Sequence, residues 1–495
     1  MFSAELSSAR GRALTRGIAR RCGGNRGRAR ALVLAGLICA AQGAGAGAAD
    51  GLASGAESPP AATGSVAATG GPAVAADASP SAADEQRFAV HAQATYVDQQ
   101  TNDFRSPYHG PNSLTAGSGR ESTDLTLFLG ARPWRGAEIW INPEMDQGFG
   151  LDDTLGLAAF SSGAAYKVGS DAPYFRLQRA FIRQTIDTGG GRENVQGTAN
   201  QLAGPHSLDR WVLTVGKISV PDIFDTNQYA HDPRNDFFNW AAIDAGTFDY
   251  AADSWGYTVG AAAERYLGSW TYRAGVFDLS TIPNSADLEP GLHELQADVE
   301  IEKRYGLLGQ TGRALLTVFY NRARMALLDQ AIALGLATGT PPDPADVRQY
   351  HSRMGVSFDL EQPITDDAGL FARVGKAGGN TEVYEFTDID RAVAVGGSLQ
   401  GLRWHRPDDT IGVALLDDGI SAEREEYLNL GGLGILVGDG KLPHPGAEQV
   451  LETYYRLGAL SWLHVSLDYQ YVKNPAYNRD RGPVSIYGVR VHAQF

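Results

Sequence analysis

Residues 486–495 read Ile-Tyr-Gly-Val-Arg-Val-His-Ala-Gln-Phe. Apolar and polar side chains alternate along this stretch, with Tyr487, Val489, Val491 and Ala493 on one face and Gly488, Arg490, His492 and Gln494 on the other. Because successive side chains of an extended strand point to opposite faces, the stretch predicts a strand with one apolar and one polar face. The same period of two begins at Phe88 and recurs up to Phe495.

The segment 292–305 shows the alternation clearly. Its apolar face holds Leu295, Ala297, Val299 and Ile301, and its polar face holds Glu294, Gln296, Asp298, Glu300 and Glu302. A segment of about ten residues can cross a bilayer at the tilt of a barrel strand. Sixteen segments are predicted as strands in this way: 88–96, 121–132, 136–146, 174–186, 209–218, 255–265, 269–279, 292–305, 312–323, 350–361, 368–376, 391–403, 409–417, 448–459, 463–472 and 484–495.

A soluble β-sandwich would alternate as well, so other features must decide between the two folds. A barrel is favoured by the length of the strands, the scarcity of helical segments and the aromatic residues near strand ends, Tyr96, Trp134, Tyr305 and Trp462. No stretch after residue 50 reaches the roughly eighteen uninterrupted apolar residues of a spanning helix. The sequence predicts an all-β fold, a transmembrane antiparallel β-barrel of about sixteen strands with a polar lumen, over residues 87–495.

Two kinds of segment interrupt the strand pattern. Residues 324–335 have apolar side chains at helical spacing and precede the breaker Thr-Gly-Thr-Pro-Pro at 338–342, which predicts a helix in an extracellular loop. The glycine runs 189–191 and 431–434 lack the Lys-Ser/Thr that follows a phosphate-binding loop. Hairpin turns are therefore predicted at both runs.

Residues 1–48 have the composition of an export signal peptide. Eight arginines precede the apolar run 31–40, and small residues follow it. Both cysteines, Cys22 and Cys39, lie in this leader, so the mature chain is expected to hold no thiol for a disulfide, a metal site or a nucleophile. Residues 49–86 are rich in Ala, Gly, Ser and Pro, and they are predicted to form a disordered linker.

The charge balance narrows the expected partners. The formal net charge is −15, and the leader contributes +7, so the mature chain would carry −22. An acidic surface of this kind is not expected to bind nucleic acid. The acidity is compatible with a pore for cations or neutral solutes, but it does not choose between them.

Several motifs resemble those of known outer-membrane proteins. The final strand with its terminal Phe495 resembles the signature by which outer-membrane barrels engage their assembly machinery. Residues 468–483 look like the penultimate hairpin of the carbohydrate-selective porin family, often called OprB-like. The further resemblances are Glu-Met-Asp-Gln-Gly-Phe-Gly at 144–150, Gly-Lys at 216–217, Asp-Ile-Phe-Asp at 222–225 and Phe-Asp-Tyr-Ala-Ala-Asp-Ser-Trp-Gly-Tyr at 248–257.

The resemblance implies a sixteen-stranded, homotrimeric, passive channel in the outer membrane of a Gram-negative bacterium. It implies small carbohydrates as permeating solutes. The barrel itself predicts contact with outer-membrane lipid and lipopolysaccharide and downhill transport without a cofactor. No metal site is predicted, because the sequence has no His-x-x-x-His or Glu-x-x-His pair. The substrate preference comes from the resemblance and not from the strand period.

Residues 222–249 are the richest source of polar groups for a sugar site. A sugar offers hydroxyls in several directions and an apolar ring face, so a selective constriction needs donors and acceptors on opposing walls, with an aromatic platform. We predict that the segment folds inward and narrows the pore, because Phe237, Phe238 and Trp240 favour burial. The alternative is a solvated outer loop. The candidate side chains in this segment are Asp225, Arg234, Asn239 and Trp240.

A second set of candidates lies on predicted strands. Arg179 and Arg183 share one face, while strict alternation puts Arg176 on the other, so a bulge or an end position is required. Across the lumen, an acidic ladder could set up a transverse field with these arginines. The alternative is ion pairing along the barrel wall without contact to solute. The candidates in this second set are Arg179, Arg183, Glu294, Asp298, Glu300 and Arg353.

Other functions remain open at this point. A general porin or an exporter of acidic polysaccharide would share the fold, although the acidic ladder argues against the exporter. An outer-membrane lipase would need a serine-histidine pair on the lipid side, and the pair Ser466 and His464 is predicted to face the lumen. A secreted soluble β-protein used for adhesion is a third possibility.

Overall fold

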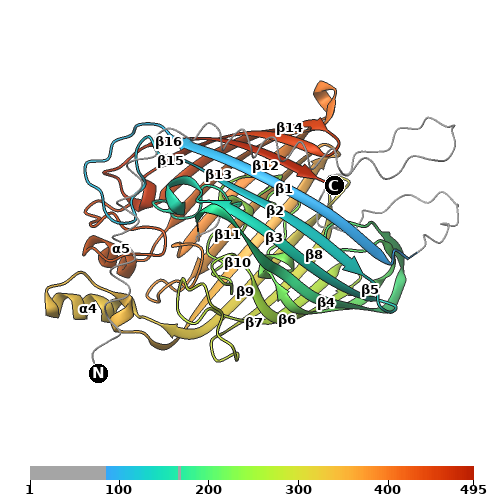
Figure 1. Cartoon of the computed structure of the whole chain (residues 1–495), viewed down its shortest axis with the longest axis horizontal. Coiled ribbons are helices and arrows are strands. Elements are labelled where there is room, and N and C mark those ends of the chain that lie inside the picture. Colours follow the sequence, from blue (N-terminus) through green and yellow to red (C-terminus); the bar gives the residue numbers. More distant parts are fainter. Residues whose placement is uncertain (1–84, 166–168) are drawn as a thin grey trace. The chain divides into compact units, whose positions relative to one another are not determined.

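The computed structural model describes residues 85–165 and 169–495. In this part of the chain sixteen strands form one closed antiparallel barrel, in which each strand pairs with its sequence neighbours and β1 closes against β16 (Figure 1). The predicted signal peptide, both cysteines and all but the last two residues of the predicted linker lie outside the described residues. The strands are β1 (Phe88–Thr101), β2 (Gly119–Ala131), β3 (Ala137–Gly148), β4 (Ser170–Val195), β5 (Gly204–Ile218), β6 (Thr258–Leu267), β7 (Trp270–Asp278), β8 (Leu295–Leu307), β9 (Gln310–Met325), β10 (Gln349–Thr365), β11 (Ala368–Ala377), β12 (Arg391–Gly401), β13 (Arg406–Gly419), β14 (Glu448–Leu460), β15 (Leu463–Lys473) and β16 (Val484–Gln494).

The two faces of each strand meet different surroundings. On β8, Val299 is 52% exposed and Ile301 is 38% exposed. The residues that alternate with them, Asp298 and Glu300, are almost fully buried. Apolar side chains thus cover the outside of the barrel, and polar side chains point inward, as in other barrels that sit in lipid. The predicted fold class and all sixteen predicted strands are confirmed.

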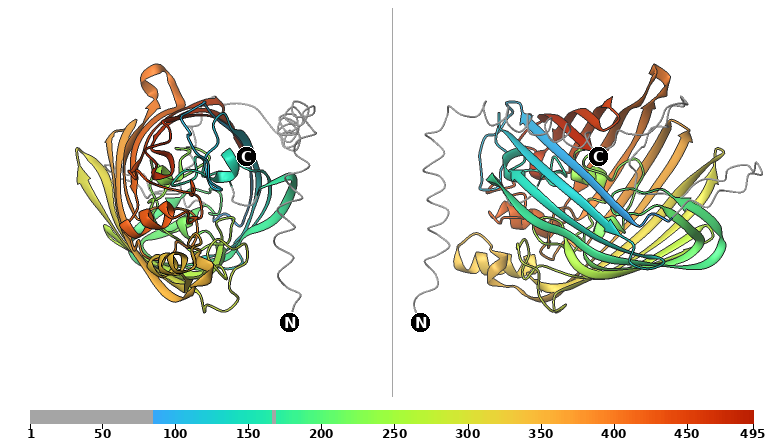
Figure 2. Two further views of the ribbon diagram at one scale, coloured as in Figure 1. Left: turned by 90° about the vertical axis from the view of Figure 1, so that its left-hand side faces the viewer. Right: turned by 45° about the vertical axis from the view of Figure 1, so that its right-hand side comes forward.

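The two ends of the barrel differ in their connections. Short turns join the strands at the end where β1 begins, and long connections join them at the opposite end. In outer-membrane barrels the long connections are extracellular and the short turns periplasmic. Figure 2 views the barrel from the end with the long connections, several of which fold into the ring of strands.

Three α-helices lie in the extracellular connections of the described chain: α3 (Trp240–Ile243), α4 (Leu328–Thr338) and α5 (Ala422–Asn429). The predicted helix at 324–335 is shifted, because β9 continues to Met325 and the helix ends at Gly339 in a left-handed conformation. The helix α5 was not predicted, because its polar surface gives little apolar periodicity. No helix among the described residues combines the length and apolarity that a membrane crossing requires.

The longest connection, residues 219–257, folds into the barrel as predicted. Its backbone is anchored on carboxylates of the inner wall: Asp225 N donates to Glu300 Oε2 at 2.7 Å, and Asn239 N donates to Glu452 Oε2 at 3.1 Å. These bonds satisfy buried N–H groups that would otherwise be costly. Acidic residues of the wall therefore hold the segment inside the barrel.

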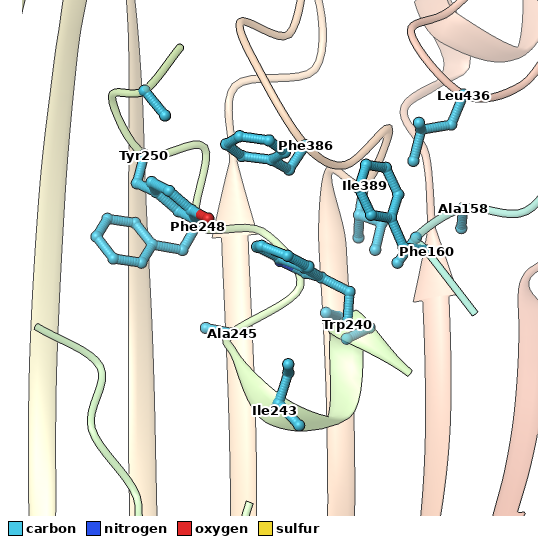
Figure 3. Close-up of a cluster of buried hydrophobic side chains, with 14 of the residues drawn as sticks. Ala158, Phe160, Trp240, Ile243, Ala245, Phe248, Tyr250, Phe386, Ile389 and Leu436 are labelled. Atoms are coloured by element: carbon cyan, nitrogen blue, oxygen red, sulfur yellow. The ribbon is translucent and has the colours of Figure 1, made fainter. Parts of the chain in front are cut away.

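Aromatic side chains form the core of the infolded segment (Figure 3). Trp240 stacks on Phe386 at 5.3 Å and on Tyr250 at 6.0 Å between ring centroids, and Phe160 meets it edge-on at 5.5 Å. Phe160 and Phe386 come from two other extracellular connections. The cluster therefore joins three connections into one packed body inside the barrel.

The run Gly189–Gly191 lies within β4, so the predicted hairpin turn at these residues is wrong. The turn comes later, between Val195 and Gly204. The second run, 431–434, lies in the long connection between β13 and β14, where a short hairpin turn was also wrongly predicted. Both runs contain glycines with a positive φ, at 189–191 and at Gly431, but neither run forms the tip of a hairpin.

Candidate functional site

Two cavities lie inside the barrel and share part of their lining. One has a volume of about 120 Å³ and the other about 370 Å³. The residues common to both linings lie where the two cavities meet, and we take them as the candidate constriction. These residues are Arg179, Asp222, His231, Pro233 and Arg234.

The first ion pair of the constriction joins the wall to the infolded segment. Arg179 of β4 donates two hydrogen bonds to Asp222, from Nε at 2.7 Å and from Nη2 at 2.6 Å. Burial alone would raise the pKa of the Asp222 carboxyl, but the charge and hydrogen bonds of Arg179 outweigh it and lower the pKa. Asp222 is therefore held in its ionised form.

A register shift in β4 brings its arginines to the inside. Asn142 of β3 pairs with Arg179 and Pro143 pairs with Leu177, which leaves Gln178 as an extra residue. The bulge that the sequence requires is thus present, and Arg176 points inward, where it stacks over the Trp255 ring at 3.4 Å.

The second ion pair crosses from the infolded segment to β2. Arg234 Nε lies 3.2 Å from Asp124 Oδ1, and Arg234 Nη2 lies 3.9 Å from Glu144 Oε2. His231 Nδ1 lies 3.5 Å from Asp244 Oδ1. The constriction therefore presents donors and acceptors from both sides, with its arginines matched by acids.

Aromatic rings line the smaller, extracellular cavity beside the constriction. Trp240, Tyr250 and Phe386 contribute from the aromatic cluster, and Trp255 and Tyr257 from the end of the infolded segment. Trp240 keeps 8% of its surface exposed and Trp255 keeps 9%. Ring faces next to paired charges are the combination that a sugar requires.

The larger, periplasmic cavity is lined by arginines that have acidic partners. Arg210 Nη1 lies 2.7 Å from Glu193 Oε1, and Arg273 Nε lies 3.2 Å from Glu264 Oε2. Arg183 Nη1 donates to the carbonyl oxygen of Asn200 at 2.8 Å. Because the charges are paired, the cavity offers hydrogen-bonding groups without a strong field of one sign.

The ten predicted site residues fall into two groups. Arg179, Arg183, Arg234 and Trp240 line the cavities. The other six line neither cavity, and most of them hold the extracellular connections in place through buried contacts. These six are Asp225, Asn239, Glu294, Asp298, Glu300 and Arg353.

Arg353 and Asn239, two residues of the second group, stabilise the extracellular connections. Arg353 is fully buried and lies 2.8 Å from Asp249 and 3.3 Å from Asp390, so it joins two connections to β10. Asn239 accepts a hydrogen bond from Ala241 N and caps α3. The acidic ladder of β8 faces inward, but the infolded segment covers it, so it does not meet the arginines of β4 across an open lumen.

Three residues of the site were not predicted from the sequence: Asp222, Asp124 and Tyr257. Asp124 lies on the polar face of a predicted strand, and that position alone gave no sign of its partner Arg234, 110 residues away. No group of three or more His, Cys, Asp or Glu side chains in residues 85–165 and 169–495 could hold a metal ion. The pair Ser466 and His464 lies on the inner face, where Ser466 Oγ accepts a hydrogen bond from Arg490 at 3.1 Å.

The chain matches known proteins in both sequence and structure. The family model described as carbohydrate-selective porin, OprB family, matches residues 112–495. The high-pH structure of Pseudomonas putida OprB has a TM-score of 0.62 at 15% identity, covering 83% of this chain and 94% of that one. No curated protein matches the chain.

Two further solved structures match less closely. The low-pH structure of Pseudomonas putida OprB has a TM-score of 0.45 at 13% identity, covering 83% of this chain and 93% of that one. The outer membrane channel DcaP of Acinetobacter baumannii has a TM-score of 0.46 at 12% identity, covering 82% and 97%. The family match spans most of the barrel, so the chain belongs to the OprB family of carbohydrate-selective porins, which places it in the outer membrane of Gram-negative bacteria as a channel for sugars.

Proposed function

We propose that small neutral sugars pass the barrel one at a time through the constriction of Arg179, Asp222 and Arg234, with Trp240 beside it. The observation that carries the proposal is the meeting of two cavities at paired charges next to an aromatic wall. Passage is downhill diffusion and uses no cofactor. The permeating solute exchanges hydrogen bonds with the wall instead of with water.

The paired charges favour hydroxyl groups over ions. A hydroxyl both donates and accepts, so it can bond to the carboxylate of Asp222 and to the guanidinium of Arg179 or Arg234. A bare ion would be attracted by one partner of each pair and repelled by the other. Moving a neutral polyhydroxy solute from water into the constriction therefore costs less free energy than moving a salt ion there.

The proposal extends to the surroundings of the barrel. The outward apolar faces would contact outer-membrane lipid and lipopolysaccharide. Phe495, whose ring stacks on Trp462 at 5.3 Å, would be part of the final-strand signal read by the assembly machinery. A homotrimer stays a prediction from the family resemblance.

Conductance measurements in planar bilayers with a panel of sugars test this function. We expect saturable block of the ion current by monosaccharides and no block by amino acids. Trp240→Ala should weaken the block because the ring beside the constriction is lost, and Trp240→Phe should retain more of it.

Trp134→Ala is the matched control, because Trp134 is 55% exposed in a periplasmic turn. It should leave the block unchanged. Equal block in Trp240→Ala and in the unchanged chain would remove Trp240 from the site. A current that no sugar blocks in saturable fashion would instead identify a general porin.

A further inference from the structure

The hairpin formed by the ends of β4 and β5 runs past both neighbouring strands. β3 pairs with β4 only as far as Ala137 opposite Gln184, and β6 pairs with β5 only as far as Tyr266 opposite Arg210. Residues 188–209 therefore pair only with each other in the sheet. We name these residues the exit hairpin, since they lie at the periplasmic end of the barrel, where the connections are short.

Three glycines bend the exit hairpin. Gly189, Gly190 and Gly191 have φ angles of 133°, 78° and 92°, a region that other residues rarely adopt. The pairing of the two strands shifts register on both sides of Gly189. The bend brings the tip of the hairpin, residues 196–203, back toward the barrel.

The tip is seated inside the periplasmic mouth. Asn200 Oδ1 accepts a hydrogen bond from Asn142 Nδ2 at 2.8 Å, and the Asn200 carbonyl accepts one from Arg183 Nη1 at 2.8 Å. Asn142 is fully buried on the inner face of β3. Leu202 is also fully buried, and its N–H donates to Glu138 Oε2 at 3.2 Å. The tip is therefore bound to the inner wall and does not hang free in the periplasm.

A clamp secures the base of the tip. Arg132, in the turn between β2 and β3, donates from Nε to the Gln86 carbonyl at 3.0 Å and from Nη2 to the Ala203 carbonyl at 3.2 Å. Gln86 and Ala203 also bond directly, through Gln86 N to Ala203 O at 3.0 Å and Ala203 N to Gln86 Oε1 at 2.8 Å. The hairpin is thus tied to the residues that lead into β1.

The seated tip forms one wall of the periplasmic cavity. Val195, Ala199, Asn200 and Gln201 line this cavity of about 370 Å³, whose other end is the constriction. A solute that has passed Arg179 and Asp222 therefore enters a chamber that the exit hairpin partly closes. The volume falls within the range of about 300–1,000 Å³ of sites for small molecules.

We propose that the exit hairpin is a second filter of the channel, and that the chamber above it holds a small saccharide between the constriction and the periplasm. Asn200, Gln201 and Arg183 supply donors and acceptors for its hydroxyls at the exit. The inference rests on the proposed function, because it assigns a second site to the same permeating solute. The exit hairpin selects solutes by size as they leave the channel, while the constriction selects them by their hydrogen-bonding groups.

Two substitutions in one turn test the filter. Arg132→Ala removes the clamp, and Arg135→Ala removes the same charge from an exposed side chain of the same turn. The full chain is reconstituted in planar bilayers for conductance and in liposomes for uptake of glucose and sucrose. We expect Arg132→Ala to raise the conductance and to raise sucrose uptake several-fold more than glucose uptake. Arg135→Ala should match the unchanged chain.

A second variant removes the hairpin itself. Replacing residues 190–208 with Asn-Gly keeps the parts of β4 and β5 that pair with β3 and β6. This variant should raise sucrose uptake further than Arg132→Ala does. Heat-modifiable migration on gels verifies that each variant forms the barrel. Equal ratios of sucrose to glucose uptake in the shortened, clamp-free and unchanged chains would overturn the filter, even though saturable sugar block persists. Absence of sugar block in the unchanged chain would overturn the proposed function and this inference with it.

Discussion

At the scale of single residues, the interior of the barrel is organised by matched charges. Arg179 with Asp222, Arg234 with Asp124 and Arg353 with Asp249 each join segments that are far apart in the sequence. A buried charge without a partner would be expensive, so each pair fixes the position of the segment that carries it. The first two pairs also give the pore hydrogen-bonding groups with little net charge.

His231 gives this site a pH dependence. Burial lowers the pKa of His231, but Asp244 outweighs it, with Asp225 adding to the rise and Arg373 opposing it, so the pKa lies above its ordinary value of 6.5. The folded segment therefore binds this proton more tightly than an unfolded chain does. The resulting stability is complete below the ordinary pKa and is lost as the pH rises through the raised pKa.

We expect sugar block to weaken as the pH is raised through the pKa of His231, which lies above 6.5, because the ion pair of His231 and Asp244 beside the constriction is lost. The measurement is a titration of current block against pH. His231→Gln should abolish the pH dependence, and His293→Gln, which changes an exposed histidine, should retain it. Identical titrations of His231→Gln and the unchanged chain would exclude His231 as the responsible group.

The sequence proposed some of the residues that line the cavities but not their partners. Polar and aromatic side chains stand out in a strand face or a long connection, which is why it could propose Arg179, Arg183, Arg234 and Trp240. Their partners could not be found, because Arg179 and Asp222 are 43 residues apart and only the closed barrel brings them together. For the same reason Glu300 was predicted to meet solute, although its carboxylate accepts a hydrogen bond from the backbone N–H of Asp225.

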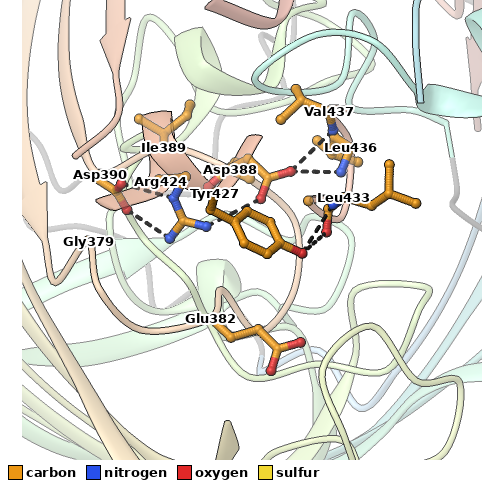
Figure 4. Close-up of polar contacts among 12 residues, drawn as sticks. Gly379, Glu382, Asp388, Ile389, Asp390, Arg424, Tyr427, Leu433, Leu436 and Val437 are labelled. Atoms are coloured by element: carbon orange, nitrogen blue, oxygen red, sulfur yellow. Dashed lines mark hydrogen bonds and ion pairs between the residues drawn. The ribbon is translucent and has the colours of Figure 1, made fainter. Parts of the chain in front are cut away.

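At the scale of elements, α5 and the connection 378–390 form a polar joint on the extracellular side (Figure 4). Arg424 of α5 is 3% exposed and donates to both oxygens of Asp390, from Nε at 2.9 Å and Nη2 at 3.1 Å. Asp388 accepts hydrogen bonds from the backbone of Leu436 and Val437. Arg424 and Asp388 thus join the connection 378–390 to the connection between β13 and β14.

Arg424→Gln should loosen this joint. Removing one partner of a buried ion pair costs about 3–5 kcal/mol, since the other charge stays buried without compensation. Limited proteolysis of the folded protein should cut the extracellular connections faster in this variant. Arg403→Gln, at a side chain that is 58% exposed, should be cut at the rate of the unchanged chain. Equal rates for both variants would show that Arg424 does not secure the connections.

A helix or strand could be predicted when the pattern that causes it lies within its own residues. Each strand was found because lipid on one side and polar surroundings on the other impose a period of two on its own residues. The helix α5 and the exit hairpin were not found, because α5 depends on Arg424 reaching Asp390 and the hairpin on Arg132 reaching Ala203. Those contacts leave no periodic trace in the sequence.

At the scale of the whole molecule, stability depends on the outward faces staying apolar. Val299 is 52% exposed on β8 and would face the hydrocarbon. Val299→Arg should lower the free energy of unfolding by up to about 2–4 kcal/mol, with the largest loss at the bilayer midplane.

Folding into lipid vesicles at increasing urea concentration measures this loss. Leu336→Arg in α4 is the control, because Leu336 is 63% exposed outside the strands. The urea concentration at the unfolding midpoint of Leu336→Arg should equal that of the unchanged chain. A shift of equal size in both variants would contradict the assignment of the outer faces to lipid.

The contacts between the infolded segment and the barrel wall also determine when the narrow passage forms during assembly. Residues 219–257 are anchored on Glu300 of β8 and on Glu452 of β14, and Glu452 follows its partner Asn239 by 213 residues. Until β14 has joined the sheet, the anchor on Glu452 does not exist. The narrow passage is therefore completed only late in the assembly of the barrel.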